Sequence, residues 1–157
     1  MHEFSTQQFL PIPVSEAWVF FSSPKNLSLI TPPEMDFKIV TPYLENKIYE
    51  GMKIEYRVKP LFGITMKWES RIAHVLAPHY FTDIQTKGPY AFWQHTHHFI
   101  EKEGGVLMLD DVIYKLPLGF IGNTVHRLIV RKKIEKIFKY RRNILTQLFS
   151  ENGKRVA

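Results

Sequence analysis

The sequence contains no cysteine. This absence excludes a disulfide scaffold, a thiol nucleophile and a thiolate metal site, and it is typical of proteins from reducing compartments. The chain also lacks any run of about 18 apolar residues, the length that a membrane-spanning helix requires. Its first residues, MHEFSTQQFLPIP, have neither the basic flank nor the apolar run of a signal peptide, so we expect a cytoplasmic location.

Several catalytic signatures are missing as well. The sequence has no Gly-rich phosphate loop, no dinucleotide-binding fingerprint and no Ser-His-Asp order, and its Gly104-Gly105 pair is typical of a hairpin turn. P-loop hydrolysis, dinucleotide chemistry and triad-type acyl transfer are therefore not expected.

The composition is that of one folded domain. The chain has 157 residues, of which 45% are hydrophobic and 23% charged. A single core usually serves about 100 to 200 residues, and this apolar content suffices to offset the entropy of ordering the chain. We expect one domain over residues 1–157.

The net charge of +6 is concentrated in one segment. Between Leu118 and Arg142 the chain has one acid, Glu135, and a local charge of +7, and the remainder sums to −1. The eight basic residues of this segment are Arg127, Arg131, Lys132, Lys133, Lys136, Lys139, Arg141 and Arg142.

The hydrophobic pattern predicts an α+β order of elements. Residues 3–11 are expected to form a strand, 13–21 a helix and 26–30 a second short helix. The period then becomes two, and six strands are predicted at 37–43, 52–59, 64–77, 80–87, 92–102 and 106–116. The connections are too short for parallel crossovers, so the strands should form an antiparallel meander.

The last predicted element is a long amphipathic helix from Gly122 to Ser150, followed by a frayed tail at 151–157. Its apolar stripe is expected to comprise Val125, Leu128, Ile134, Ile137, Phe138, Ile144, Leu145 and Leu148, with the basic residues opposite. A curled seven-stranded sheet, with this helix over its concave face, would enclose a pocket.

Short sequence motifs lie along residues 3–149. They are Asn26-Leu27, Ile30-Thr31-Pro32-Pro33, Gly51-Met52, Tyr56, Phe62-Gly63, Trp68, Phe81-x-Asp83-x-Gln85-x-x-Gly88-Pro89, Trp93-x-His95-x-His97-x-Phe99, Asp110-x-Val112-x-Tyr114-x-x-Pro117-x-Gly119 and Ile137-Phe138-x-Tyr140-Arg141. The order of elements resembles the helix-grip fold of the START-like, or SRPBCC, superfamily, and these motifs resemble a bacterial ligand-binding SRPBCC subgroup. The resemblance implies a cavity between sheet and helix.

Trp93, His95 and His97 alternate along one face of a predicted strand. Two such imidazoles lie about 7 Å apart and could share a ligand or a metal, or could be lining histidines that hydrogen-bond Asp110 or Tyr114. The run His95-x-His97-x-x-x-Glu101 resembles a cupin metal motif, but the required glycine spacing and second motif are missing. We therefore expect no metal and no cofactor.

Other candidates for the pocket are polar or aromatic residues on the inward phase of their strands. If its strand face lines the pocket, Asp110 would have a raised pKa and could act as an acid or base, with Tyr114 as a donor; the alternative is a salt bridge or a surface position. Asp83 and Gln85 could bind a ligand or form cross-strand hydrogen bonds. The aromatic residues, which could be cavity walls or core, are Tyr56, Trp68, Trp93 and Tyr114.

These features predict a carrier or sensor for an apolar, aromatic or lipid-like small molecule, in a cavity of at least about 300 Å³. The alternative is a cyclase-, dehydratase- or hydrolase-type enzyme in which His95 or His97 is the base and Asp110 or Tyr114 the acid. The basic helix should mostly be solvated. We expect no nucleic-acid partner, and at most weak, salt-sensitive contact with an anionic membrane.

Overall fold

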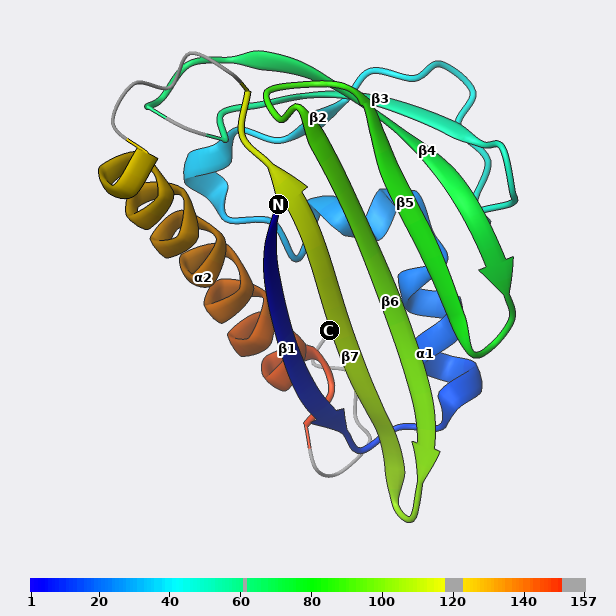
Figure 1. Ribbon diagram of the computed structural model, residues 1–157. Coiled ribbons are helices and arrows are strands. Elements are labelled where there is room, and N and C mark those ends of the chain that lie inside the picture. Colours follow the sequence, from blue (N-terminus) through cyan, green and yellow to red (C-terminus); the bar gives the residue numbers. More distant parts are fainter. Residues whose placement is uncertain (61, 118–122, 151–157) are drawn as a thin grey trace.

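One seven-stranded antiparallel sheet organises the computed structural model, which describes residues 1–60, 62–117 and 123–150 and, for 123–127, the backbone alone. The sheet order is β1-β7-β6-β5-β4-β3-β2, so β2 to β7 form a meander and β1 returns to pair with β7 (Figure 1). The strands are β1 (His2–Leu10), β2 (Lys38–Ile39), β3 (Lys53–Val58), β4 (Met66–Leu76), β5 (Tyr80–Lys87), β6 (Phe92–Lys102) and β7 (Gly105–Lys115). The predicted α+β fold class is confirmed.

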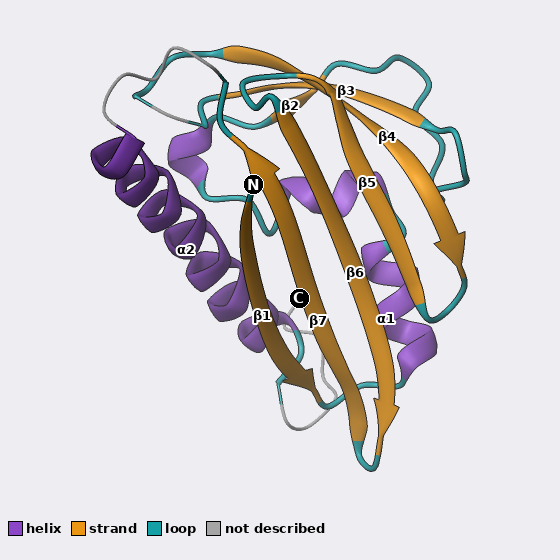
Figure 2. Cartoon of the chain, viewed as in Figure 1, coloured by secondary structure: helices purple, strands orange, loops and turns teal. Residues whose placement is uncertain are grey.

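The helices are α1 (Val14–Phe21) and α2 (Asn123–Leu148), with 3₁₀ turns η1 (Pro24–Ser28) and η2 (Pro33–Met35) between α1 and β2. Figure 2 shows α1 behind the sheet and α2 running past the β1 edge. In the described part of the chain, no helix is both long enough and apolar enough to cross a membrane. The expected helix start at Gly122 and the tail from Glu151 lie outside the described residues.

Two predicted elements differ from the observed ones, and one observed element was not predicted. The second short helix is a 3₁₀ turn that begins at Pro24, and η2 was not predicted. The strand expected over 37–43 is only two residues long, and its pairing becomes irregular beyond Ile39: the N–H groups of Val40 and Thr41 both donate to the Glu55 carbonyl, and the Thr41 hydroxyl accepts the Glu55 N–H at 2.6 Å.

Two irregularities curve the sheet where β4 meets β5. The register shifts between Glu69 and Ser70 and again between Ile72 and His74. Bulges of this kind bend the strand and redirect its side chains. Between the two shifts, Asp83 pairs with Ile72 on one side and with His95 on the other.

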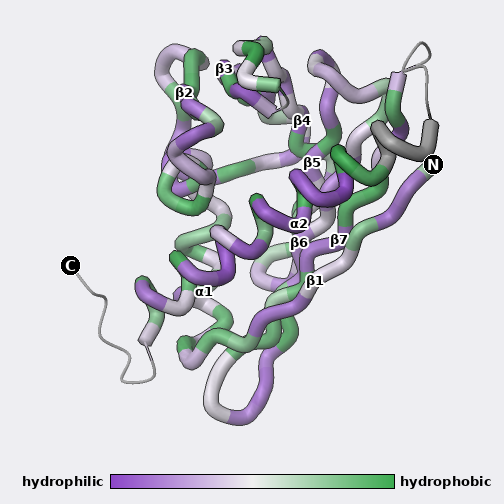
Figure 3. Tube along the Cα trace, turned by 90° about the vertical axis from the view of Figure 1, so that its left-hand side faces the viewer, coloured by the Kyte–Doolittle hydropathy of each residue, from purple (hydrophilic) through white to green (hydrophobic). Residues whose placement is uncertain are grey.

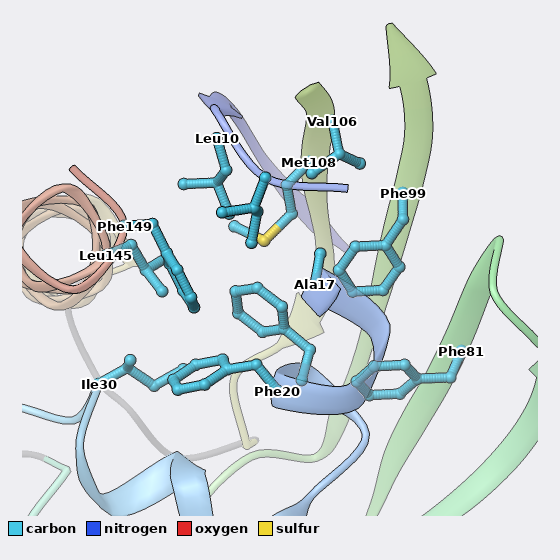
Figure 4. Close-up of a cluster of buried hydrophobic side chains, with 12 residues drawn as sticks. Leu10, Ala17, Phe20, Ile30, Phe81, Phe99, Val106, Met108, Leu145 and Phe149 are labelled. Atoms are coloured by element: carbon cyan, nitrogen blue, oxygen red, sulfur yellow. The ribbon is translucent and has the colours of Figure 1, made fainter. Parts of the chain in front are cut away.

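The largest apolar cluster joins the sheet to both helices, as Figure 4 shows. Phe20 from α1 and Phe149, just after α2, have ring centroids 5.2 Å apart. Leu145 of α2 belongs to the same cluster and is fully buried. This cluster fixes one end of α2 against α1 and the sheet.

The inward stripe of α2 differs from the predicted one. The buried residues are Val130, Ile134, Phe138, Arg141 and Leu145, at the spacing of a single helical face. Leu128 was expected in the stripe but is 49% exposed, because it precedes Val130 by two positions, a rotation of about 200°. Figure 3 shows the resulting alternation of hydrophobic and hydrophilic residues along α2. The side chain of Val125 lies outside the described residues.

We expect Leu145→Ala to lower the free energy of unfolding by about 2–5 kcal/mol, since it leaves a cavity in a packed cluster. Leu128→Ala, on the same helix but exposed, should change it by less than about 0.5 kcal/mol. Urea denaturation of both variants measures the difference. Equal losses would contradict the assignment of the inward face.

Candidate ligand-binding site

A partly open cavity of about 200 Å³ lies between the sheet, α1 and α2, and its lining is mainly apolar. The volume is smaller than the 300 Å³ expected from the sequence, at which sites for drug-sized ligands begin. An engineered apolar cavity of about 150 Å³ binds benzene. This cavity therefore suits a compound of one or two rings, and the volume argues against a whole lipid.

The structure brings six of the nine candidate residues to the cavity wall. These six are Tyr56, Trp68, Asp83, Trp93, His95 and His97. The other three, Gln85, Asp110 and Tyr114, do not line this cavity. The side-chain amide of Gln85 donates to the Tyr90 carbonyl at 2.8 Å and so holds the turn before β6. Tyr114 is buried against the rings of His2, Tyr90 and Trp93.

Aromatic rings form one side of the cavity. Tyr56 and Trp68 are stacked with centroids 5.9 Å apart, and Trp93 meets Trp68 edge-on at 5.5 Å. The Ser70 hydroxyl fixes this wall: it accepts the Trp68 indole N–H at 3.1 Å and lies 3.2 Å from the Tyr56 hydroxyl. Burial raises the pKa of Tyr56, which stays a neutral phenol. The wall is thus flat and largely apolar, with one hydroxyl pair behind it.

The part of the wall next to these rings is polar and rests on the Asp110 carboxylate; Ser70 joins the two parts, since it also donates to Asp83. Asp110 Oδ1 lies 2.8 Å from His95 Nε2 and 3.0 Å from His97 Nδ1, so one oxygen contacts both imidazoles. The ring centroids of the two histidines are 3.8 Å apart. Asp83 Oδ2 lies on their other side, 3.4 Å from His97 Nε2 and 3.9 Å from His95 Nδ1. The histidines are therefore bracketed by two carboxylates.

Arg141 completes the polar side, although the sequence pattern placed it on the outer basic face of the helix. Its Nη2 lies 3.4 Å from Asp110 Oδ1 and 3.3 Å from His97 Nδ1. The guanidinium also lies over the rings of Phe21 and Phe138. Its buried Nε has no hydrogen-bond partner among the described residues. The expectation of an entirely outward basic face is wrong at this position.

Two pKa shifts follow from this arrangement. Burial raises the pKa of Asp110, but the Arg141 guanidinium and the hydrogen bonds from His95 and His97 outweigh it and hold this pKa well below its usual range. The raised pKa is therefore wrong for Asp110, and the alternative expectation, a salt bridge, is the one that the structure has. Burial and the neighbouring His97 lower the pKa of His95, which favours its neutral form.

Sequence reasoning missed Arg141 and Ser70. A signal for Arg141 existed, since it falls three positions after Phe138 and four before Leu145, on the apolar stripe. Ser70 shares the inward phase of Trp68 and Ile72 but carried no motif. Asp83, His95 and His97 could together hold a metal ion, because one donor atom from each lies within 4.8 Å of the others. Glu101, the acid of the cupin-like run, is exposed at the end of β6.

Solved structures share this architecture. A protein from Mycobacterium smegmatis, Ms6760, matches with a TM-score of 0.67 and 14% identity, over 96% of this chain and 92% of its own. The di-domain ARO/CYC BexL of the BE-7585A biosynthetic pathway matches at 0.70 and 14%, over 95% of this chain and 50% of BexL. Ara h 8.0201 matches at 0.56 and 15%, over 92% and 97%.

These similarities, each at 14–15% identity, show the helix-grip fold that the order of elements resembled. No protein-family model matches the sequence, and no curated protein does either.

We expect Arg141→Met to destabilise the protein by about 3–5 kcal/mol near neutral pH, since it leaves Asp110 buried without its cation. In the native protein the lowered pKa of Asp110 contributes stability above the usual carboxyl pKa, and this contribution is lost as the pH falls. The stability gap between the two proteins should therefore widen from pH 3 to pH 6. Urea titrations across this range measure it.

Arg142→Met is the matched control on the next residue of α2. Arg142 is exposed and donates to Thr6 Oγ1 and to the Gln7 carbonyl. Its loss should cost less than about 1 kcal/mol, as is usual for exposed contacts. A constant gap for Arg141→Met over the pH range would contradict the role assigned to Asp110.

Proposed function

We propose that this protein binds a small, mainly apolar ring compound in the cavity between its sheet and α2, as a carrier or a sensor. The observation that carries the proposal is the asymmetry of the cavity. Stacked aromatic rings form one part of its wall, and Asp83, His95, His97 and Arg141 form another part beside them. Ligand sites typically combine apolar walls with a few convergent polar groups that fix the ligand's orientation.

The two sides together define the chemistry of the ligand. A flat ring system fits against Tyr56 and Trp68, which are held in place by Ser70. A hydroxyl or carbonyl group on that ring would reach the imidazoles, whose acceptor or donor atoms are otherwise buried at the wall. The ligand class is therefore a one- or two-ring compound with one polar substituent.

A second candidate function, proton transfer to or from a bound ligand, is favoured by the contact between Asp110 and the two histidines. A carboxylate behind an imidazole fixes its tautomer and leaves the other nitrogen to act as a base. In this version His95 or His97 is the base, and Asp110 is a positioning residue instead of the acid. Tyr114 is buried away from the cavity and takes no part. The structural neighbour BexL is named as an ARO/CYC, which is compatible with this candidate.

Binding can be tested with 1-naphthol, which has two rings and one hydroxyl. We expect saturable binding by titration calorimetry, and about tenfold weaker binding of naphthalene, which lacks the hydrogen-bonding group. Ile137 lines the cavity, so Ile137→Trp should fill it and abolish binding. Ile100→Trp, an equal substitution at a residue 42% exposed on β6, should leave binding unchanged. Equal effects of the two variants, or no binding at all, would count against the proposal.

The second candidate can be tested with 2-tetralone in D₂O, because a base at the cavity wall should exchange the protons next to the ketone for deuterium. We expect proton NMR to show exchange above the buffer rate, with most of the excess lost in His97→Gln. His98→Gln is the control, since His98 faces away from the cavity and pairs with Asp111. Binding without exchange would contradict the proton-transfer function and would support only the carrier or sensor function.

A further inference from the structure

We propose that Asp83, His95 and His97 form a site for one divalent transition-metal ion in the cavity wall. The three residues come from two neighbouring strands, where Asp83 lies directly opposite His95 and His97 follows on the same face of β6. All three side chains line the cavity. An ion held by them would therefore face the space in which the proposed ligand binds.

The distances approach those of a bound ion. Zinc with nitrogen and oxygen ligands at about 2.0–2.2 Å keeps the ligand atoms of a tetrahedral site about 3.3–3.6 Å apart. Asp83 Oδ2 is 3.4 Å from His97 Nε2 and 3.9 Å from His95 Nδ1. All three donor atoms lie within 4.8 Å of one another, so an ion requires only a small inward shift of His95.

Asp110 determines which nitrogens face the site. It accepts from His95 Nε2, so the proton of that neutral ring lies on Nε2 and the lone pair of Nδ1 faces the site. His97 Nδ1 lies 3.0 Å from the same oxygen and 3.3 Å from Arg141 Nη2. A metal ion on His97 Nε2 would place the ring proton on Nδ1, where Asp110 accepts it. The lone pairs of His95 Nδ1 and His97 Nε2 would then point, with the Asp83 carboxylate, toward the ion. Metal-binding histidines characteristically donate their second N–H to a carboxylate in this way.

The charges of the cluster also favour a cation. The carboxylates of Asp83 and Asp110 are opposed by the Arg141 guanidinium alone, so with neutral imidazoles the cluster carries one excess negative charge. Ser70 already hydrogen-bonds the other oxygen of Asp83 at 3.4 Å, which holds Oδ2 toward the histidines. The Asp83 carboxylate is thus held in position, and the negative charge of the cluster is not fully neutralised.

The donor set specifies the kind of ion. Imidazole and carboxylate suit Zn²⁺, Co²⁺ and related ions, whereas Mg²⁺ and Ca²⁺ favour oxygen alone. Three protein ligands leave a coordination position open, as in catalytic zinc sites. That position would face the cavity and would accept an oxygen of the bound compound. The metal site does not depend on the proposed ligand, and it can be measured without one.

Metal-free protein titrated with Co²⁺ should bind one equivalent and develop visible absorption bands of a low-symmetry site, and Zn²⁺ should displace it. We expect Asp83→Asn and His97→Gln to weaken Zn²⁺ binding by at least about 100-fold in calorimetry. The matched controls are His98→Gln and Asp111→Asn, which alter a second His-Asp pair, 3.5 Å apart and exposed, between β6 and β7. Both controls should bind Zn²⁺ like the native protein.

A measurement without substitution covers the case in which a cavity variant fails to fold. In ¹⁵N-histidine NMR of the native chain, Zn²⁺ should shift the imidazole resonances of His95 and His97 and leave those of His98 unchanged. Absence of one-equivalent binding, or binding that Asp83→Asn leaves intact, would overturn the site. A response of His98 in place of His95 and His97 would overturn it as well. Naphthol binding by the metal-free protein tests the cavity separately.

Discussion

The contact between the Asp110 carboxylate and the Arg141 guanidinium is the interaction on which the rest of the cavity depends. Both groups are almost completely buried, and a buried charge is tolerated only when it is paired. The pair ties the middle of α2 to β7 and places the carboxylate beneath His95 and His97. The inward face of the helix, the orientation of the imidazoles and the polarity of one cavity wall all follow from this contact.

Most of the sheet could be predicted from the sequence, because alternation of apolar and polar residues is a local signal. The limits of β5 and β6 were predicted correctly, and those of the other long strands to within two residues. The pattern failed where strand pairing becomes irregular, as at the end of β2, where Val40 and Thr41 both donate to the Glu55 carbonyl. It also gave no indication of the 3₁₀ turn over Pro33–Met35, where prolines govern the backbone instead of periodicity.

The candidate site was predictable only in part. Strand phase placed Trp68, His95 and His97 on the inward face, where the structure has them at the cavity. The alternation along a strand does not show whether an inward residue lines a cavity or packs against another side chain. The predicted site therefore includes Gln85 and Tyr114, although they lie elsewhere. The contact of Asp83 with the histidines requires the register of β5 with β6, and the contact of Arg141 requires the rotation of α2. The register has no local sequence signal, whereas the rotation of α2 has one, because Arg141 falls on the apolar stripe.

The pairing of β1 has a consequence for the order in which the chain can fold. Residues of β1 find their partners in β7 and α2, and the Gln8 side chain bonds Thr146 across 138 positions. Contacts so distant in sequence make folding slow, and they leave β1 unpaired until β7, at residues 105–115, has been synthesised. An unpaired strand invites association with other chains. The polar run Ser5-Thr6-Gln7-Gln8 in its centre disfavours such association while the strand is unpaired.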